Sequence, residues 1–229
     1  RDRTKTLNKK NIISDFSFSA RQQECLGLFG EGPDVKTTLL NLLSGSTHPT
    51  RGDINIDGIN AQIYPHKAKQ VIGYQRFKDL SHPTMSVKTF LNYIAALRGY
   101  CGAEKRARVE QAVTRLDLYP ALDAPLDALC ACTKRRVSVA QAILHTPALL
   151  LLDEPTAGLA ADQALSLKAL IRSLAQEMTV IIASRNSEEL AELCTRALLI
   201  AGGRLVADTP LPDLPVSYTH LTLPTIYSV

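Results

Sequence analysis

The sequence lacks several features that would direct it to a membrane, an oxidising compartment or a metal. No apolar run approaches the roughly 20 residues that a membrane-spanning helix needs, and no signal peptide is recognisable. The chain has five cysteines, an odd number, with no histidine near them at zinc-ligand spacing. We therefore expect free thiols in a cytosolic protein. Because the sequence begins at Arg1 without a methionine, we also expect its true N-terminus to be missing.

The sequence also lacks a strong excess of either positive or negative charge. The formal net charge is +4, and the basic residues are scattered apart from the run Lys134, Arg135 and Arg136. A run this short is read most simply as the solvated start of a helix, so no nucleic-acid partner is expected. The 229 residues, 45% of them hydrophobic, suffice for one large α/β domain with its own core.

Residues 149–158, LLLLDEPTAG, form the most informative stretch of the chain. Four consecutive leucines predict a strand that is buried on both faces. That strand ends in Asp153 and Glu154, and acids at the C-terminal end of a buried strand are typical of an α/β active site. The alternative is a solvated strand end, which the four preceding leucines disfavour.

Residues 30–37, GEGPDVKT, resemble the phosphate-binding loop G-x-x-x-x-G-K-[ST]. Gly30, Lys36 and Thr37 stand at the required spacing, but Val35 replaces the second glycine. Such a loop aims backbone N–H groups at phosphate through conformations that glycine adopts easily. A β-branched residue with φ > 0 would be an outlier there, so Val35 is expected to weaken the loop.

Two neighbouring residues are expected to weaken it further. Pro33 removes one N–H donor, and Asp34 adds a negative charge where phosphates would lie. The alternative is an ordinary strand–turn–helix, which the acidic strand disfavours. The candidate nucleotide-binding residues are Gly30, Gly32, Lys36, Thr37 and Thr38.

Apolar periodicity and turn residues predict the remaining elements. The predicted strands are 15–19, 24–29, 53–56, 71–74, 149–152, 180–183, 197–200 and 204–207. The predicted helices are 36–43, 87–98, 104–116, 134–144, 163–175 and 187–194. Asp57-Gly58 signals a hairpin. The order predicts an α/β fold with an early antiparallel β part and a helical subdomain inserted at about 87–144.

The end of the sequence does not continue this pattern. Residues 216–229, VSYTHLTLPTIYSV, contain no Asp, Glu, Lys or Arg. We therefore expect one domain over residues 1–215, followed by a tail that is not native to the protein.

Together these motifs resemble the nucleotide-binding domain of ABC transporters over roughly residues 7–214, and residues 149–155 match without a gap. The resemblance implies an ABC-type P-loop NTPase core with ATP and Mg²⁺ as cofactors. It implies that Thr37 and Asp153 hold the metal ion and that Glu154 polarises the attacking water.

Other motifs of the family match by spacing but not by chemistry. Phe77 stands where the family has a glutamine, and residues 129–133 (LCACT) replace the signature loop Leu-Ser-Gly-Gly-Gln. Ala160 replaces an aspartate, and Leu7 lies near the position of an adenine-stacking aromatic residue. Arg185 replaces the switch histidine; arginine can pair with phosphate but cannot act as a neutral imidazole.

The candidate catalytic residues are thus Glu154 and Arg185. The resemblance, which at residues 197–211 is to export-type domains, implies a bacterial ATP-binding subunit, cytoplasmic and peripheral on the inner face of the cell membrane. Its partners would be a membrane permease, met by an exposed loop at 77–83, and an identical or different nucleotide-binding domain. The altered motifs predict weak ATP binding and impaired or absent hydrolysis. An active transport motor and a decayed or misassembled gene product are the alternatives.

Overall fold

The computed structural model describes residues 5–7, 10–30, 32–76 and 84–211. Its centre is a six-stranded sheet in the order β10-β9-β3-β8-β7-β6. All neighbouring pairs are parallel except β10 with β9. The strands are β3 (Cys25–Gly30), β6 (Ile72–Gln75), β7 (Leu149–Asp153), β8 (Thr179–Ala183), β9 (Arg196–Ala201) and β10 (Arg204–Pro210).

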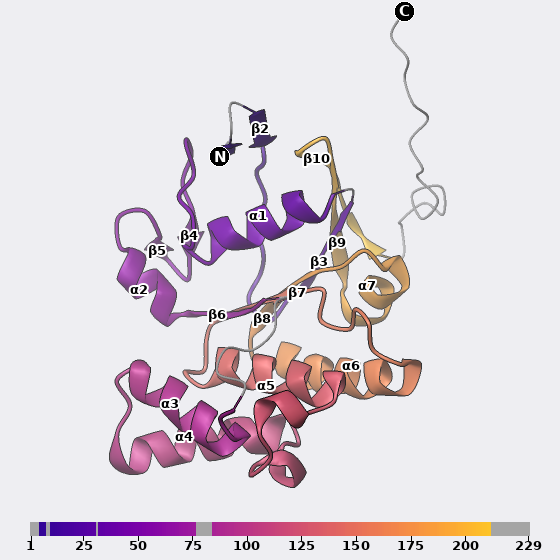
Figure 1. The fold of residues 1–229 in the computed structure, drawn as a ribbon. Helices are drawn as coiled ribbons and strands as arrows, with labels where there is room; N and C mark the ends of the chain where they lie inside the picture. The colour runs from indigo at the N-terminus through magenta and orange to yellow at the C-terminus, as the bar shows by residue number, and fades with distance from the viewer. Residues whose placement is uncertain (1–4, 8–9, 31, 77–83, 212–229) are drawn as a thin grey trace, which may run out of the picture.

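Helices cover both faces of this sheet. Figure 1 shows α1 on one side and α5 and α6 on the other, with α3 and α4 beyond α5. The helices are α1 (Pro33–Leu43), α2 (Pro65–Gln70), α3 (Val87–Leu97), α4 (Gly102–Arg115), α5 (Ala131–Ile143), α6 (Ala161–Ala175) and α7 (Ser187–Leu193). Short 3₁₀ turns at Tyr119–Ala121 and Leu126–Ala128 join α4 to α5. The predicted α/β architecture is therefore confirmed.

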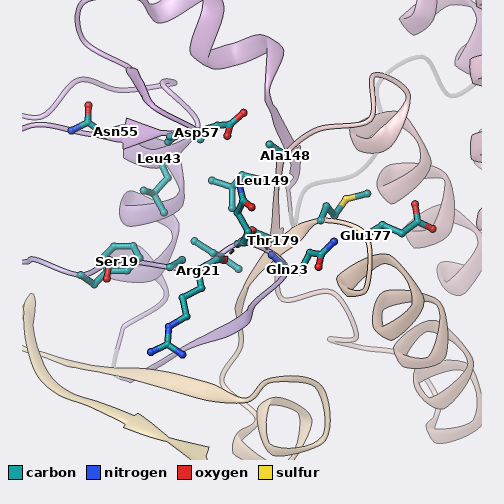
Figure 2. Close-up of a pocket in the computed structure, with 16 residues that line it drawn as sticks. Ser19, Arg21, Gln23, Leu43, Asn55, Asp57, Ala148, Leu149, Glu177 and Thr179 are labelled. Carbon is teal, nitrogen blue, oxygen red and sulfur yellow. Dashed lines mark hydrogen bonds between the residues drawn. The ribbon is translucent and has the colours of Figure 1, made fainter.

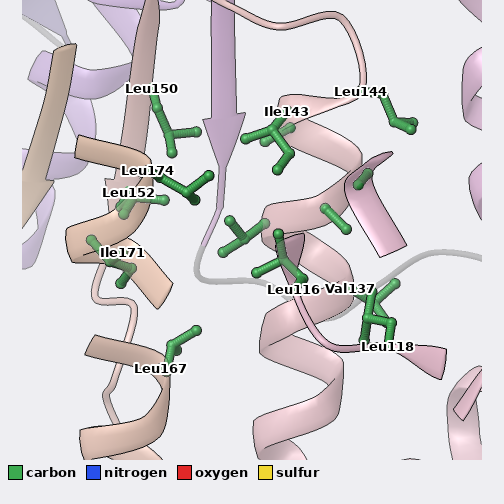
Figure 3. Close-up of a cluster of buried hydrophobic side chains, with 14 of the residues drawn as sticks. Leu116, Leu118, Val137, Ile143, Leu144, Leu150, Leu152, Leu167, Ile171 and Leu174 are labelled. Carbon is green, nitrogen blue, oxygen red and sulfur yellow. The ribbon is translucent and has the colours of Figure 1, made fainter. Parts of the chain in front are cut away.

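The four leucines of β7 connect two hydrophobic cores. Leu149 and Leu151 belong to the core that includes α1, whereas Leu150 and Leu152 belong to the core that includes α3–α6. This division follows from the alternation of side chains along a strand. Figure 3 shows the second core, in which residues of α5 and α6 meet the strand. Burial on both faces explains why the first four residues of β7 are all apolar.

The early part of the chain is antiparallel, as predicted. Strands β1 (Lys5–Leu7) and β2 (Lys10–Ile13) pair with each other, and so do β4 (Asn55–Ile56) and β5 (Ile59–Asn60). The second hairpin turns at Asp57 (φ 49°) and Gly58 (φ 75°). Positive φ at both central residues is the requirement of a type I′ turn, so the Asp-Gly signal identified this hairpin correctly.

The predicted strand at 15–19 is wrong. Strand β2 ends at Ile13, and Asp15 has φ 51°, which turns the chain away from an extended path. The alternation of Phe16 and Phe18 with polar residues imitated a strand. Instead the two rings pack edge to face, with centroids 5.8 Å apart. Helix α2 and strands β1 and β2 were not predicted, because such short elements carry little periodicity.

The predicted helical block at 87–144 contains α3, α4 and α5. Its buried residues share one hydrophobic core with β7, β8 and α6. The division of the chain at residue 215 stays a prediction, because the tail at 216–229 and the loop at 77–83 lie outside the described residues. Within the described ranges, no helix is both long and apolar enough to cross a membrane.

His145, which follows α5, is a buried titratable group. Its Nε2 lies 3.0 Å from the carbonyl oxygen of Ile72, while its buried Nδ1 has no hydrogen-bond partner among the described residues. Burial, together with Arg98 and Arg108, lowers the pKa of His145 from 6.5 to about 4. As the pH falls through this range, the unfolded chain takes up the proton before the folded chain does. The native state must therefore lose stability between pH 6.5 and pH 4.

Replacing His145 with glutamine tests this assignment, because an amide can still donate to the carbonyl of Ile72 but does not titrate. The unmodified chain should lose about 3 kcal/mol more than His145→Gln between pH 6.5 and pH 4, since each pKa unit corresponds to about 1.4 kcal/mol. Urea unfolding of both proteins at the two pH values measures the difference. Parallel pH profiles would contradict the assignment.

Candidate functional site

Three neighbouring parallel strands deliver polar groups to one edge of the sheet. Strands β3, β8 and β7 lie side by side in that order, and their C-terminal ends lead to Gly30, Ser184 and Asp153. Helix α1 begins directly after β3 and carries Lys36 and Thr37 to the same edge. Ligands of open α/β sheets bind beyond the carboxyl ends of the strands, so this edge is the candidate site.

Lys36 is buried at this edge, with 1% of its surface exposed. Its Nζ donates to the carbonyl oxygens of Gly30 (3.1 Å) and Ser184 (3.2 Å). Glu154 Oε1 lies 3.8 Å from the same nitrogen. Burial lowers the pKa of Lys36 below its ordinary value of 10.5, and the Glu154 carboxylate opposes that shift. The amine is thus held in place by two backbone carbonyl oxygens, with the Glu154 carboxylate nearby.

Thr37 and Asp153 form a second contact at this edge. Thr37 Oγ1 donates to Asp153 Oδ2 at 3.0 Å. Burial raises the pKa of Asp153, whereas the hydrogen bond from Thr37 lowers it. A hydroxyl and a carboxylate are hard oxygen ligands, and Mg²⁺ typically binds one or two such groups together with phosphate oxygens and water. The two side chains therefore fit a Mg²⁺ ion that arrives with a nucleotide.

Gln75 supports this pair and was missed by the sequence analysis. It is fully buried at the end of β6, and its Oε1 accepts from the backbone N–H of Asp153 at 3.2 Å. Phe77, which stands where the family has a glutamine, lies outside the described residues. A polar residue at the end of the otherwise apolar β6 was the signal that could have identified Gln75.

Glu154 and Arg185, the two candidate catalytic residues, contact each other directly. Glu154 is 9% exposed and has φ 47°. Its Oε2 accepts from the backbone N–H of Arg185 at 3.3 Å, and its Oε1 lies 3.3 Å from the Nε of the same arginine. The carboxylate therefore contacts the guanidinium group of Arg185 and, at 3.8 Å, the amine of Lys36.

The expectation that Val35 is strained is wrong. Helix α1 begins at Pro33, so Val35 is helical and does not have a positive φ. Among the described residues of this loop, positive φ values fall on Gly30 (139°) and Gly32 (75°) instead. Proline at the first helical position is favourable because it needs no N–H partner there. Of the remaining candidates, Thr38 lies half-buried on α1, one residue beyond Thr37.

The other positions that match family motifs by spacing alone lie at the ends of helices and strands. Cys130 is the N-cap residue of α5, and Ala160 is the N-cap residue of α6; neither side chain forms a capping hydrogen bond. Leu7 lies in β1. The roles assigned to all of these positions stay predictions.

Two of the cavities formed by the described residues lie at opposite ends of the strands of the sheet. A cavity of about 570 Å³ is lined by residues at the starts of strands, such as Leu149 and Thr179, and by Asn55 and Asp57 of the β4–β5 hairpin (Figure 2). It includes none of the candidate site residues. A more open pocket of about 950 Å³ is lined by residues of the candidate site and of α6 and α7, among them Glu154, Thr156, Arg185 and Glu189.

Comparisons with known proteins agree with this geometry. The family model described as "ABC transporter" matches residues 13–157, more than half of the chain. Nod factor export ATP-binding protein I of Ralstonia nicotianae is 30% identical over 204 residues, which cover 89% of this chain and 64% of that protein. ABC transporter ATP-binding protein NatA of Bacillus subtilis is 28% identical over 212 residues, covering 90% and 86%. The chain thus spans less than two thirds of the length of the Ralstonia protein.

A solved structure is similar over nearly the whole chain. It is described as the dimeric structure of a post-hydrolysis state of the ATP-binding cassette MJ0796 bound to ADP and Pi. The TM-score is 0.78 at 19% sequence identity, and the match covers 92% of this chain and 96% of that chain. The expected ABC-type fold is therefore confirmed, and the match of the family model shows that the chain belongs to the ABC transporter family.

Proposed function

We propose that this chain is the ATP-binding subunit of an ABC transporter, and that it binds MgATP weakly and hydrolyses it poorly or not at all. One observation carries the binding part of the proposal. The Lys36 amine and the Thr37–Asp153 pair lie at the same edge of the sheet, at the start of α1. A cation for the phosphates and oxygen ligands for Mg²⁺ are the groups that a P-loop NTPase site requires. When bound, Mg²⁺ would neutralise charge on the phosphates.

The contact between Glu154 and Arg185 supports impaired hydrolysis. One oxygen of this carboxylate lies 3.3 Å from a guanidinium nitrogen and 3.8 Å from an amine, so the group expected to polarise the attacking water already contacts two cations. Loss of one oriented donor in such a site can lower the rate by about 10²–10³. The replacements at Cys130 and Ala160 add to that loss.

The relatives supply the proposed partners. One is named as an export ATP-binding protein and another as an ABC transporter ATP-binding protein, and the solved neighbour is described as a dimer. We propose that this chain likewise pairs with a nucleotide-binding domain, identical or different, and docks on a membrane permease from the cytoplasmic side. The open pocket of about 950 Å³ beside Glu154 offers a surface for the second domain.

Titration of the purified chain with a non-hydrolysable ATP analogue, with and without Mg²⁺, tests the binding. We expect saturable but weak binding that Mg²⁺ strengthens, because Thr37 and Asp153 contribute only when the ion is present. Thr37→Val is the matched variant, since it keeps the size of the side chain and removes the oxygen. Equal binding with and without Mg²⁺ would contradict the assignment of these two residues.

An active motor is the second candidate function, and the retention of both Asp153 and Glu154 favours it. The two candidates differ in one measurable rate. We expect the isolated chain to release phosphate from ATP at or near background, and Glu154→Gln to leave that rate unchanged. Turnover above background that Glu154→Gln removes would establish the motor instead.

A further inference from the structure

Glu189 is the most deeply buried carboxylate among the described residues, with 1% of its surface exposed. It lies on α7, and its two oxygens accept hydrogen bonds from two different loops. Oε1 accepts from Thr156 Oγ1 at 2.6 Å, and Oε2 accepts from Ser184 Oγ at 2.5 Å. Helix α7 itself does not need this carboxylate, because Asn186 caps its N-terminus.

Each of the two loops carries part of the candidate site. Ser184 follows β8; its carbonyl oxygen accepts from Lys36 Nζ at 3.2 Å, and the next residue, Arg185, contacts Glu154. Thr156 lies two residues after Glu154, in the turn that leads from β7 towards α6. Glu189 is therefore hydrogen-bonded to both loops without contacting the groups expected to bind the nucleotide.

The burial of this side chain indicates that it has a specific structural role. Removing a carboxylate from water is costly unless hydrogen bonds compensate, and here two short hydroxyl bonds do so. The bond to Thr156 spans 33 residues of sequence and fixes tertiary geometry, whereas the bond to Ser184 spans 5 residues and ties α7 to the loop that precedes it. The same pocket wall includes Thr156, Ser184 and Glu189, so this geometry also shapes the surface beside Glu154.

We infer that Glu189 is a positioning residue: it holds the loops at 153–157 and 184–186 at a fixed separation and so keeps the Ser184 carbonyl on the Lys36 amine. The expected effect on nucleotide affinity rests on the proposed ATP-binding function. The geometric part concerns the nucleotide-free chain and can be tested by itself.

The first test uses the nucleotide-free chain. Glu189→Gln and Thr156→Val should each increase amide hydrogen exchange in both loops, and the double variant should exceed Glu189→Gln by little, because both changes break one network. Competitive acetylation should show Lys36 becoming more reactive relative to the exposed Lys88. Glu188→Gln, one residue away but exposed, is the control and should change neither quantity. Thr156→Val keeps the test available if Glu189→Gln does not fold.

The second test measures affinity for a non-hydrolysable ATP analogue with Mg²⁺. Glu189→Gln should raise the Kd about tenfold, the typical effect of losing an outer hydrogen bond that orients a ligand-binding group. Exchange and Lys36 reactivity equal to those of Glu188→Gln, or an increase in exchange spread over the whole sheet, would overturn the inference. Absence of nucleotide binding by the unmodified chain would overturn the proposed function, while the exchange and acetylation results would still decide the role of Glu189.

Discussion

Replacing Lys36 with methionine should remove nucleotide binding while changing the stability of the fold little. The amine is the buried cation at the ends of β3 and β8, and its hydrogen bonds are to backbone carbonyls that cannot bind phosphate themselves. A hydrogen bond to a charged group contributes about 1.5–3 kcal/mol. Its loss lowers the affinity roughly 10- to 100-fold, which takes a weak site below detection.

Two opposing effects act on stability in this variant. Methionine stabilises the fold because no ammonium group has to be buried. It destabilises the fold because the carbonyl oxygens of Gly30 and Ser184 lose their hydrogen-bond donor. We expect a net change within about 2 kcal/mol. Lys36→Ala should lose nucleotide binding equally but be less stable than Lys36→Met, because it leaves a cavity where a side chain with 1% exposure stood.

Isothermal titration with the ATP analogue and urea unfolding measure the two quantities on the same samples. Lys88→Met, at an exposed site on α3, is the control for loss of a positive charge. Retained binding in Lys36→Met would show that the phosphate site lies elsewhere, and the function proposed for this edge of the sheet would be wrong.

The features that could be predicted from the sequence are those marked by a pattern of neighbouring residues. The four leucines of β7 identified a buried strand, and the Asp57-Gly58 pair identified a hairpin. The acids at the end of β7 and the residues of the phosphate loop were placed by spacing alone, and the structure brings Lys36, Thr37, Asp153 and Glu154 to one edge. Local pattern was sufficient for each of these.

The features that could not be predicted depend on residues that are distant in sequence. Gln75 contacts Asp153 from 78 residues away, and Glu189 contacts Thr156 from 33 residues away. No periodicity marks such contacts. The interpretation of Val35 failed for a different reason: the motif assigned it a loop conformation, whereas the helix already begins at Pro33. A motif specifies the spacing of residues, but the start of the helix decides which of them need a positive φ.

The two glycines of the loop are therefore expected to tolerate alanine to different degrees. A Cβ on Gly30 would lie 1.9 Å from the carbonyl oxygen of Ile200, its partner on β9, and Gly30 has φ 139°. Backbone cannot move aside as a side chain can, so the sheet would have to separate there. We expect Gly30→Ala to lose at least about 3 kcal/mol of stability.

Gly32→Ala is the matched variant, because it adds the same methyl group two residues away. The nearest atom to a Cβ at Gly32 is Val35 Cγ2 at 3.7 Å, an ordinary contact, so only the φ of 75° opposes alanine. The expected loss is about 1–2 kcal/mol. Urea unfolding of both variants gives the comparison, and equal losses would contradict it. Because the Gly30 carbonyl also accepts from Lys36, Gly30→Ala should weaken ATP-analogue binding more than Gly32→Ala does, which links the packing of β3 against β9 to the position of the amine.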